Sequence, residues 1–156
     1  MAALSNFLEN KLIDFLFRGQ ALGITGASAA SGTGPTTIYV ALYTSSPTDA
    51  GGGTEVTGGS YARVAVTSSL ANWAGTQSAG STTASSGTSG TTSNNNAITF
   101  PAPTANWGTV VAAALLDAST GGNILAYGAL TNNKTINNGD AAPSYPAGAL
   151  TFQLDN

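Results

Sequence analysis

The sequence contains no histidine and no cysteine, and charged residues make up only 7% of its 156 residues, against roughly 25% in an ordinary soluble domain. Without these residues the chain cannot form a Ser-His-Asp or Cys-His catalytic arrangement, a disulfide or a thiolate metal site. Its four basic side chains are too few to neutralise a run of phosphates, so we expect no nucleic-acid partner. We therefore expect a protein without enzymatic activity, cofactor or bound metal.

Long hydrophobic runs are absent as well. The longest run spans residues 110–116, far short of the roughly 18 residues that a membrane-spanning helix needs. The apolar stretch near the N-terminus contains Glu9, Lys11 and Asp14 and lacks a basic start, so it does not resemble a signal peptide. We therefore expect no membrane partner.

The first element that the sequence predicts is an amphipathic helix over residues 4–18. Its apolar residues recur at helical spacing and form one stripe: Leu4, Leu8, Leu12, Phe15 and Leu16. Ser5 or Asn6 can cap the start of this helix, and Gly19 can end it. The stripe either packs only on the chain's own core or also contacts a neighbouring subunit. We take its five residues as the candidate assembly contacts.

The rest of the chain has the pattern of a β protein. Short segments rich in β-branched and aromatic residues alternate with turns rich in glycine, at 36–44, 61–67, 97–100, 107–117, 123–130 and 149–154. These segments predict a mainly β fold, an antiparallel β-sandwich resembling a jelly roll, with one N-terminal α-helix. We divide the chain into residues 1–35, the helix and a flexible connector, and residues 36–156, the β-sandwich domain.

Residues 74–96 form a low-complexity excursion within this domain. The stretch consists of Ser, Thr, Gly, Asn, Ala and Gln and contains no large apolar side chain. Such a segment buries too little apolar surface to offset the entropy of ordering it. The sequence therefore predicts that it is mobile or held by neighbouring subunits.

Several functional alternatives have some support. A hydrolase such as a depolymerase needs two carboxylates across one cleft, and the candidates are Asp49, Glu55, Asp117 and Asp140. Asp49 and Glu55 could also bind calcium, although their spacing matches no EF-hand. All four acids are better explained as residues of turns or solvated loops. A carbohydrate-binding module would need an exposed aromatic platform, for which the candidates are Tyr61, Trp73, Trp107 and Tyr127.

Four consecutive motifs resemble a known family. They read YVALYTSSPTDAGGGTEVTGGSYARVAV at 39–66, ITFPAPTANWGTV at 98–110, LLDASTGGNILAYGAL at 115–130 and KTINNGDAAPSYPAGALTFQLD at 134–155. Together with the helix at 8–19, they are similar to small virion proteins of tailed bacteriophages, commonly called phage tail fibre proteins. Similar β-rich chains serve as capsid decoration, or cement, proteins. The motifs of this family contain no catalytic residue.

The resemblance implies a structural protein of the virion, assembled in the cytoplasm of the bacterial host. We expect a capsid decoration protein that stabilises the shell, with a tail, tail-fibre or baseplate component as the alternative and a carbohydrate-binding module at the host surface as a second alternative. The expected partners are further copies of the chain, as a trimer, and the major capsid protein or tail proteins of the same phage. A surface with few charges suits such packing, because it lacks long-range repulsion between copies.

Overall fold

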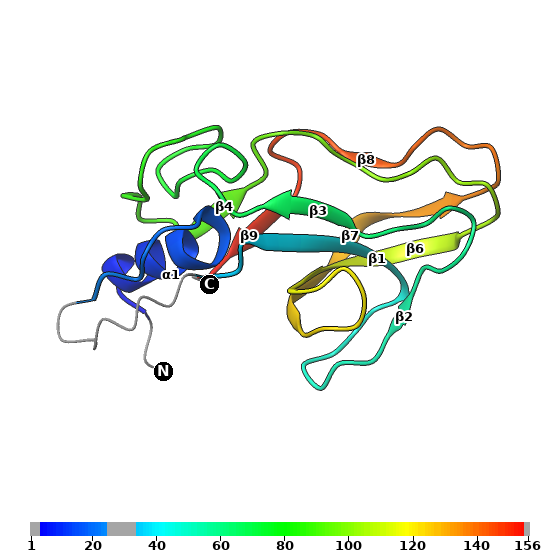
Figure 1. Cartoon of the computed structure of the whole chain (residues 1–156), viewed down its shortest axis with the longest axis horizontal. Coiled ribbons are helices and arrows are strands. Elements are labelled where there is room, and N and C mark those ends of the chain that lie inside the picture. Colours follow the sequence, from blue (N-terminus) through cyan, green and yellow to red (C-terminus); the bar gives the residue numbers. More distant parts are fainter. Residues whose placement is uncertain (1–3, 25–33, 155–156) are drawn as a thin grey trace. The chain divides into compact units, whose positions relative to one another are not determined.

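The computed structural model describes residues 4–24 and 34–154. Its helix and strands are α1 (Asn6–Arg18), β1 (Thr37–Ser45), β2 (Thr54–Glu55), β3 (Val64–Thr67), β4 (Thr91–Ser93), β5 (Ile98–Thr99), β6 (Gly108–Leu116), β7 (Ile124–Ile136), β8 (Ser144–Tyr145) and β9 (Thr151–Gln153) (Figure 1). The chain is mainly β, with antiparallel pairing and one N-terminal helix. This confirms the predicted fold class.

The chain groups into two compact units. The first comprises Met1–Thr37, Thr67–Ile98 and Tyr145–Asn156, and the second comprises Ile38–Val66 and Thr99–Ser144. Each unit is described by itself below. Most of the predicted connector at 20–35 lies outside the described residues. Whether residues 36–156 fold without the helix stays a prediction.

The second unit is built on an antiparallel sheet with the strand order β2-β1-β6-β7, in which β3 also pairs with β1. Across β1 and β6, Tyr39 lies opposite Leu116 and Tyr43 lies opposite Ala112. The pairing of β6 with β7 shifts register between Val110 and Ala112. β7 has 13 residues and is longer than the segment that its apolar pattern predicted, because its second half is polar.

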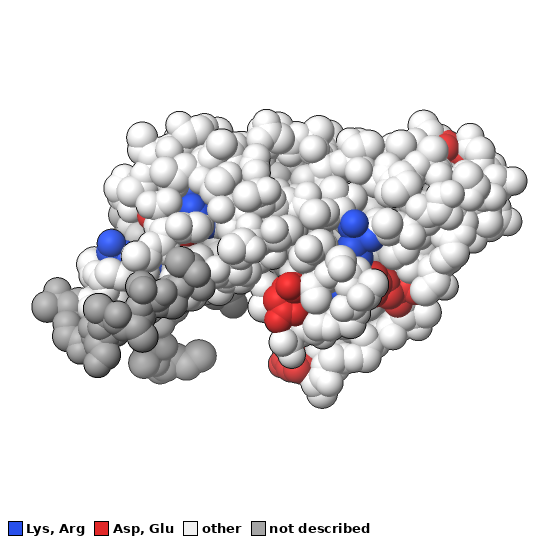
Figure 2. Space-filling model, in the orientation of Figure 1, with Lys and Arg blue, Asp and Glu red and all other residues white. Residues whose placement is uncertain are grey.

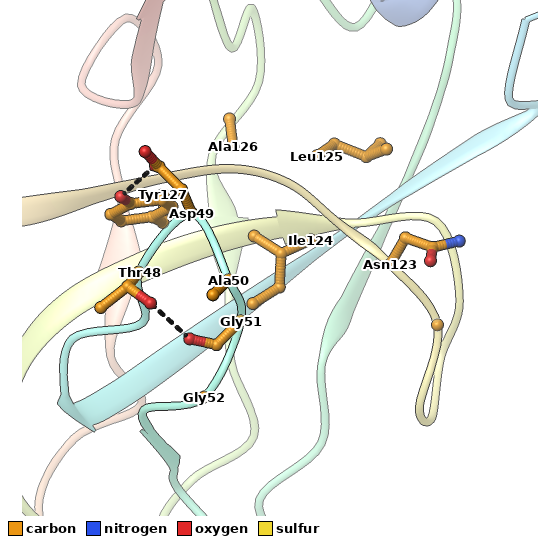
Figure 3. A pocket seen from close by; sticks show the side chains of 11 residues that line it. Thr48, Asp49, Ala50, Gly51, Gly52, Asn123, Ile124, Leu125, Ala126 and Tyr127 are labelled. Atoms are coloured by element: carbon orange, nitrogen blue, oxygen red, sulfur yellow. Dashed lines mark hydrogen bonds between the residues drawn. The ribbon is translucent and has the colours of Figure 1, made fainter.

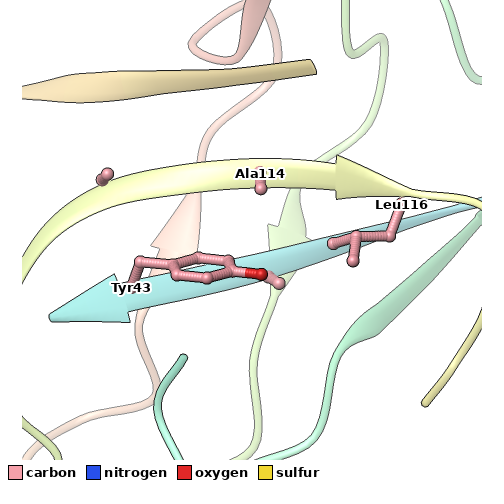
Figure 4. Packing of buried hydrophobic residues seen from close by; sticks show 5 residues of the cluster. Tyr43, Ala114 and Leu116 are labelled. Carbon is pink, nitrogen blue, oxygen red and sulfur yellow. The ribbon is translucent and has the colours of Figure 1, made fainter. Parts of the chain in front are cut away.

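One face of this sheet carries a compact cluster of buried side chains. Its members are Ala41, Tyr43, Ala112, Ala114 and Leu116. Figure 4 shows the ring of Tyr43 beside the small side chain of Ala114. The alanines of β6 thus leave room for an aromatic ring on β1, which keeps this face filled.

Three aromatic rings form a second packed group in the same unit. Tyr61 stacks on Phe100 at 6.2 Å and meets Trp107 edge to face at 5.3 Å between ring centroids. The indole Nε1 of Trp107 donates to the carbonyl of Gly59 at 2.9 Å. The backbone N–H of Leu42 donates to the Tyr61 hydroxyl at 2.9 Å. Burial raises the pKa of the Tyr61 phenol well above its usual value.

The first unit contains α1 and a short ladder between β4 and β9. The side chain of Ser5 accepts a bond from the Leu8 N–H, and Gly19 ends the helix with φ 67°. Both caps were among those predicted. A Cβ at Gly19 would lie 2.7 Å from the carbonyl oxygen of Ser68. Glycine is therefore required there both by the backbone conformation and by this close approach.

Candidate assembly surface on helix α1

The face of α1 that packs on the core differs from the one that the apolar spacing predicted. Ile13 and Phe17 are almost completely buried, together with Glu9, Asp14 and Arg18. The Phe17 ring lies 5.1 Å from Trp73 and 4.9 Å from Phe152, measured between centroids. The helix therefore buries a face on which three charged side chains accompany two large apolar ones.

Arg18 is the organising residue of this buried face. Its side chain is fully buried and forms an ion pair with Asp14 at 2.6 Å. Nε donates to the carbonyl of Trp73 at 3.0 Å, and Nη1 donates also to the hydroxyl of Ser85 at 3.1 Å. Nη2 donates to two loop carbonyls, those of Ser81 at 3.3 Å and Thr83 at 2.6 Å. All five guanidinium N–H groups therefore have acceptors, which is what allows the charge to be buried.

Two further helix side chains hold the low-complexity stretch. Asp14 Oδ2 accepts from the backbone N–H of Ser85 at 2.9 Å, and its Oδ1 accepts from the Ser85 hydroxyl at 2.6 Å. Asn10 accepts from the Thr76 hydroxyl at 2.6 Å and donates to the Gly87 carbonyl at 3.0 Å. The structure shows this stretch in contact with the chain's own helix, and the mobility predicted for residues 74–96 stays a prediction. Polar side chains of the chain's own helix replace the missing apolar core.

The predicted apolar stripe lies only in part on the opposite side of α1. At 3.6 residues per turn, Leu8 and Phe15 lie roughly half a turn from Ile13 and Phe17. Leu12 and Leu16 lie between the two faces, and Leu4 precedes the helix, which begins at Asn6. Leu4 is 42% exposed, and its neighbour Phe7 is 57% exposed. The other predicted contacts are each half-buried: Leu8, Leu12, Phe15 and Leu16. We use the name α1 stripe for the five predicted residues together with the exposed Phe7, which lies about half a turn from Leu16.

The charge around the α1 stripe is small. Lys11 is the cation among its neighbours, and its Nζ lies 5.9 Å from the centroid of the Phe7 ring. Figure 2 shows the few charged side chains of one face of the molecule as small, separate patches in an uncharged surface. A partner would therefore meet apolar and hydroxyl groups rather than a strong field.

The four acids considered above as catalytic carboxylates or calcium ligands each bind a loop or another side chain. Glu55 binds Arg63 through both carboxylate oxygens, at 2.8 and 2.7 Å. Asp117 accepts two bonds from Asn123, which lower the pKa of that carboxyl. Asp140 Oδ2 accepts from the Asn137 N–H at 2.7 Å, and Asp49 accepts from the Tyr127 hydroxyl at 2.6 Å. Among the residues that the structure describes, no three acids gather in one cluster.

The predicted aromatic platform does not exist. Trp73 is fully buried in the first unit and Trp107 is 5% exposed in the second, while Tyr61 packs against Trp107. Of the four candidate rings, only Tyr127 is well exposed, at 40%. The platform was predicted from composition alone, and composition cannot tell a buried ring from an exposed one.

Tyr127 belongs to a groove in the second unit that the sequence did not predict as a site. The groove lies between residues 48–52 and residues 122–127. Figure 3 shows Tyr127 beside Asp49, with a second bond from the Thr48 hydroxyl to the Gly51 carbonyl. The hydrogen bond to Asp49 raises the pKa of the Tyr127 phenol. The only signal in the sequence was the glycine run at residues 51–53.

These features describe a β-rich chain with one N-terminal helix, at whose start Leu4 and Phe7 are exposed. Comparison with family models gives the more specific result. Residues 3–153 match the family described as podophage GP4 fiber I protein gp80, and the chain belongs to this family. It is therefore a structural protein of a bacteriophage and a component of the virion. A search of curated proteins finds no match. Within residues 4–24 and 34–154, no helix is long and apolar enough to cross a membrane.

Proposed function

We propose that this chain is a component of the phage tail or tail fibre and that it is attached to its protein neighbours through the α1 stripe. The observation that carries the proposal is the orientation of the helix. Leu4 and Phe7, at its N-terminal end, are 42% and 57% exposed, while the charged Glu9, Asp14 and Arg18 are buried. Exposed apolar side chains gathered on one face are typical of protein interfaces.

The fibre named in the family description supports the tail position. The capsid decoration role expected from the sequence is the alternative, and the α1 stripe serves either position equally well. We further propose that the chain acts without catalysis and binds other copies of itself. Tail proteins are its further partners, or the major capsid protein in the decoration alternative. The trimer expected from the sequence stays a prediction.

The energetics favour attachment through many copies. Full burial of an exposed leucine or phenylalanine contributes about 1.5–3 kcal/mol, and four of the six residues of the stripe are already half-buried. Each copy therefore contributes a modest amount of binding energy. Attachment at several points converts such contacts into tight binding through effective concentration.

The test of attachment is a double variant, Leu4→Ser with Phe7→Ser, supplied to a phage that lacks its own copy of the gene. We expect the amount of this protein per purified particle to fall at least tenfold, while its circular dichroism and unfolding midpoint stay unchanged. The matched control is Leu125→Ser, which removes a leucine of similar exposure in the second unit, 38% against 42%. Normal incorporation of the double variant would contradict the proposal.

The position in the particle is tested separately. Particles are dissociated into heads and tails, and the copies of this chain in each fraction are counted by quantitative mass spectrometry. We expect the chain to remain with the tails. Recovery in hundreds of copies with the heads would instead establish the decoration alternative.

A further inference from the structure

The strand β7 forms one edge of the sheet in the second unit. In the order β2-β1-β6-β7, β6 is the strand with which it pairs, and this pairing is regular from Ala126 to Ala129. In the described part of the chain, no backbone hydrogen bond outside this ladder involves residues 126–129. Tyr127, Gly128 and Ala129 are all exposed. The outward N–H and C=O groups of this segment are therefore open to a further strand.

Residues 126–129, which we call the β7 edge, lack the features that usually prevent two sheet edges from pairing. Edge strands of natural proteins commonly carry a lysine, a proline or a bulge. The β7 edge reads AYGA, without charge or proline. The two register shifts of the β6–β7 ladder and Lys134 all lie outside it. The sequence therefore leaves this part of the strand as a template for pairing.

Gly128 has no reason within its own chain to be glycine. A Cβ built on it would meet no atom within 4 Å, and its φ does not lie in the left-handed region that favours glycine. A glycine inside a strand weakens that strand, and it often marks a place where another backbone approaches closely. Its position in the β7 edge therefore indicates that a second chain lies alongside.

The charges beside the β7 edge match those of a second copy in the antiparallel orientation. Tyr127 lies opposite Ala114 of β6. Along β6, Val110 with its partner Lys134 lies a similar distance to one side of Ala114 as Asp117 does to the other. A two-fold axis at Tyr127 therefore brings Lys134 of each copy towards the partner's Asp117. Asp117 is exposed, and Lys134 belongs to neither ion pair of the described residues.

We infer that the β7 edge pairs antiparallel with the β7 edge of a second copy, so that one sheet continues across two chains. Ala126 of each copy then lies opposite the partner's Gly128, and the two exposed Tyr127 rings lie side by side. Since the segment is uncharged, the copies meet without like charges facing each other. The inference rests on the proposed binding of copies to one another and names the surface that forms it, which lies in the second unit, whereas the α1 stripe lies in the first.

Sedimentation velocity of the full-length protein, from about 1 μM to about 1 mM, tests this pairing. We expect a reversible dimer. Gly128→Lys places a cation on each side of the two-fold axis in open space, so it should weaken association at least tenfold with an unchanged unfolding midpoint. Ala102→Lys is the matched control, because it adds the same charge at an exposed residue of the same unit outside the sheet. Lys134→Gln should also weaken association and reduce its dependence on salt.

Hydrogen exchange followed by NMR locates the interface. At concentrations where the dimer forms, we expect added protection at alternate amides of residues 125–129, because every second N–H of a strand points outward. A monomer throughout the concentration range, a dimer or trimer that Gly128→Lys leaves intact, or protection confined to α1 would each overturn the inference. The last result would leave the proposed attachment through the α1 stripe standing, since that is read by incorporation into particles. Leu125→Ser keeps the backbone of the edge and adds no charge, so it still serves as the control there.

Discussion

Replacement of Arg18 is the perturbation for which the structure gives the clearest expectation. Arg18→Met keeps most of the side-chain stem and removes the guanidinium that donates five hydrogen bonds in the first unit. The Asp14 carboxylate then stays buried without its cation, which is the costly part of the change. Removing one partner of a buried ion pair costs about 3–5 kcal/mol. The free energy of unfolding of a typical domain is about 5–15 kcal/mol.

Equilibrium unfolding in urea measures this loss. Trp73 reports on the first unit and Trp107 on the second, so a Trp107→Phe background isolates the signal of interest. We expect the unfolding midpoint to fall with little change in slope. Hydrogen exchange should increase most at the backbone of residues 81–87, which Asp14, Asn10 and Arg18 hold.

Two further variants decide whether the pair with Asp14 is responsible. Asp14→Asn with Arg18→Met should cost less than the sum of the single changes by at least about 1 kcal/mol, because the unpaired charge is then absent. Lys11→Met, which removes a cation of the same helix that has no ion pair in the structure, should change stability by no more than about 0.5 kcal/mol. A loss below about 1 kcal/mol for Arg18→Met, the value of an exposed pair, would refute the reasoning.

Two other predictions concern the side chains of Tyr61, Tyr145 and Arg63. Burial raises the pKa of Tyr145 to about 12 and raises that of Tyr61 further. Because the folded-state pKa values exceed the unfolded value of about 10, the stabilising contribution is complete below that pH. It is lost as the pH rises from there towards 12. The midpoint of unfolding in urea should therefore fall as the pH rises across this range, and Tyr145→Phe should make this fall shallower. A wild-type midpoint that stays constant up to pH 12 would exclude this contribution of the tyrosines. Arg63→Lys should lower the free energy of unfolding by about 1–3 kcal/mol, because lysine cannot bind both oxygens of Glu55 and the loop carbonyls. Unfolding in urea measures this change, and an unchanged midpoint would count against it.

The fold class could be predicted because its signals are local. The β-branched segments, the glycine-rich turns, and the caps at Ser5 and Gly19 each depend on neighbouring residues. The length of β7 could not be predicted in this way. Its second half reads as a loop by composition, and it is a strand because β6 pairs with it, as Thr109 does with Thr135.

The orientation of α1 could not be predicted for a different reason. Periodicity selects the most apolar stripe, and here that stripe is not the face that is buried. The buried face contains Asp14 and Arg18, which count against burial in any hydrophobicity scale. They are buried because the loop at residues 81–85 supplies their hydrogen bonds. Since those bonds are long-range, only the folded structure identifies them.

Because the chain has so few charged residues, the role of its two arginines in holding loops can be identified directly. Of four basic side chains in the chain, Arg18 holds the loop at residues 81–85, and Arg63 holds the carbonyls of Ala118 and Gly121. In both places a planar group with five donors binds loop backbone that has no large apolar side chain to bury. The loops can then consist almost entirely of Ser, Thr, Gly and Ala and still be fixed. Both arginines thus stabilise the fold from within, and because charged residues make up only 7% of the chain, few charges remain on its surface.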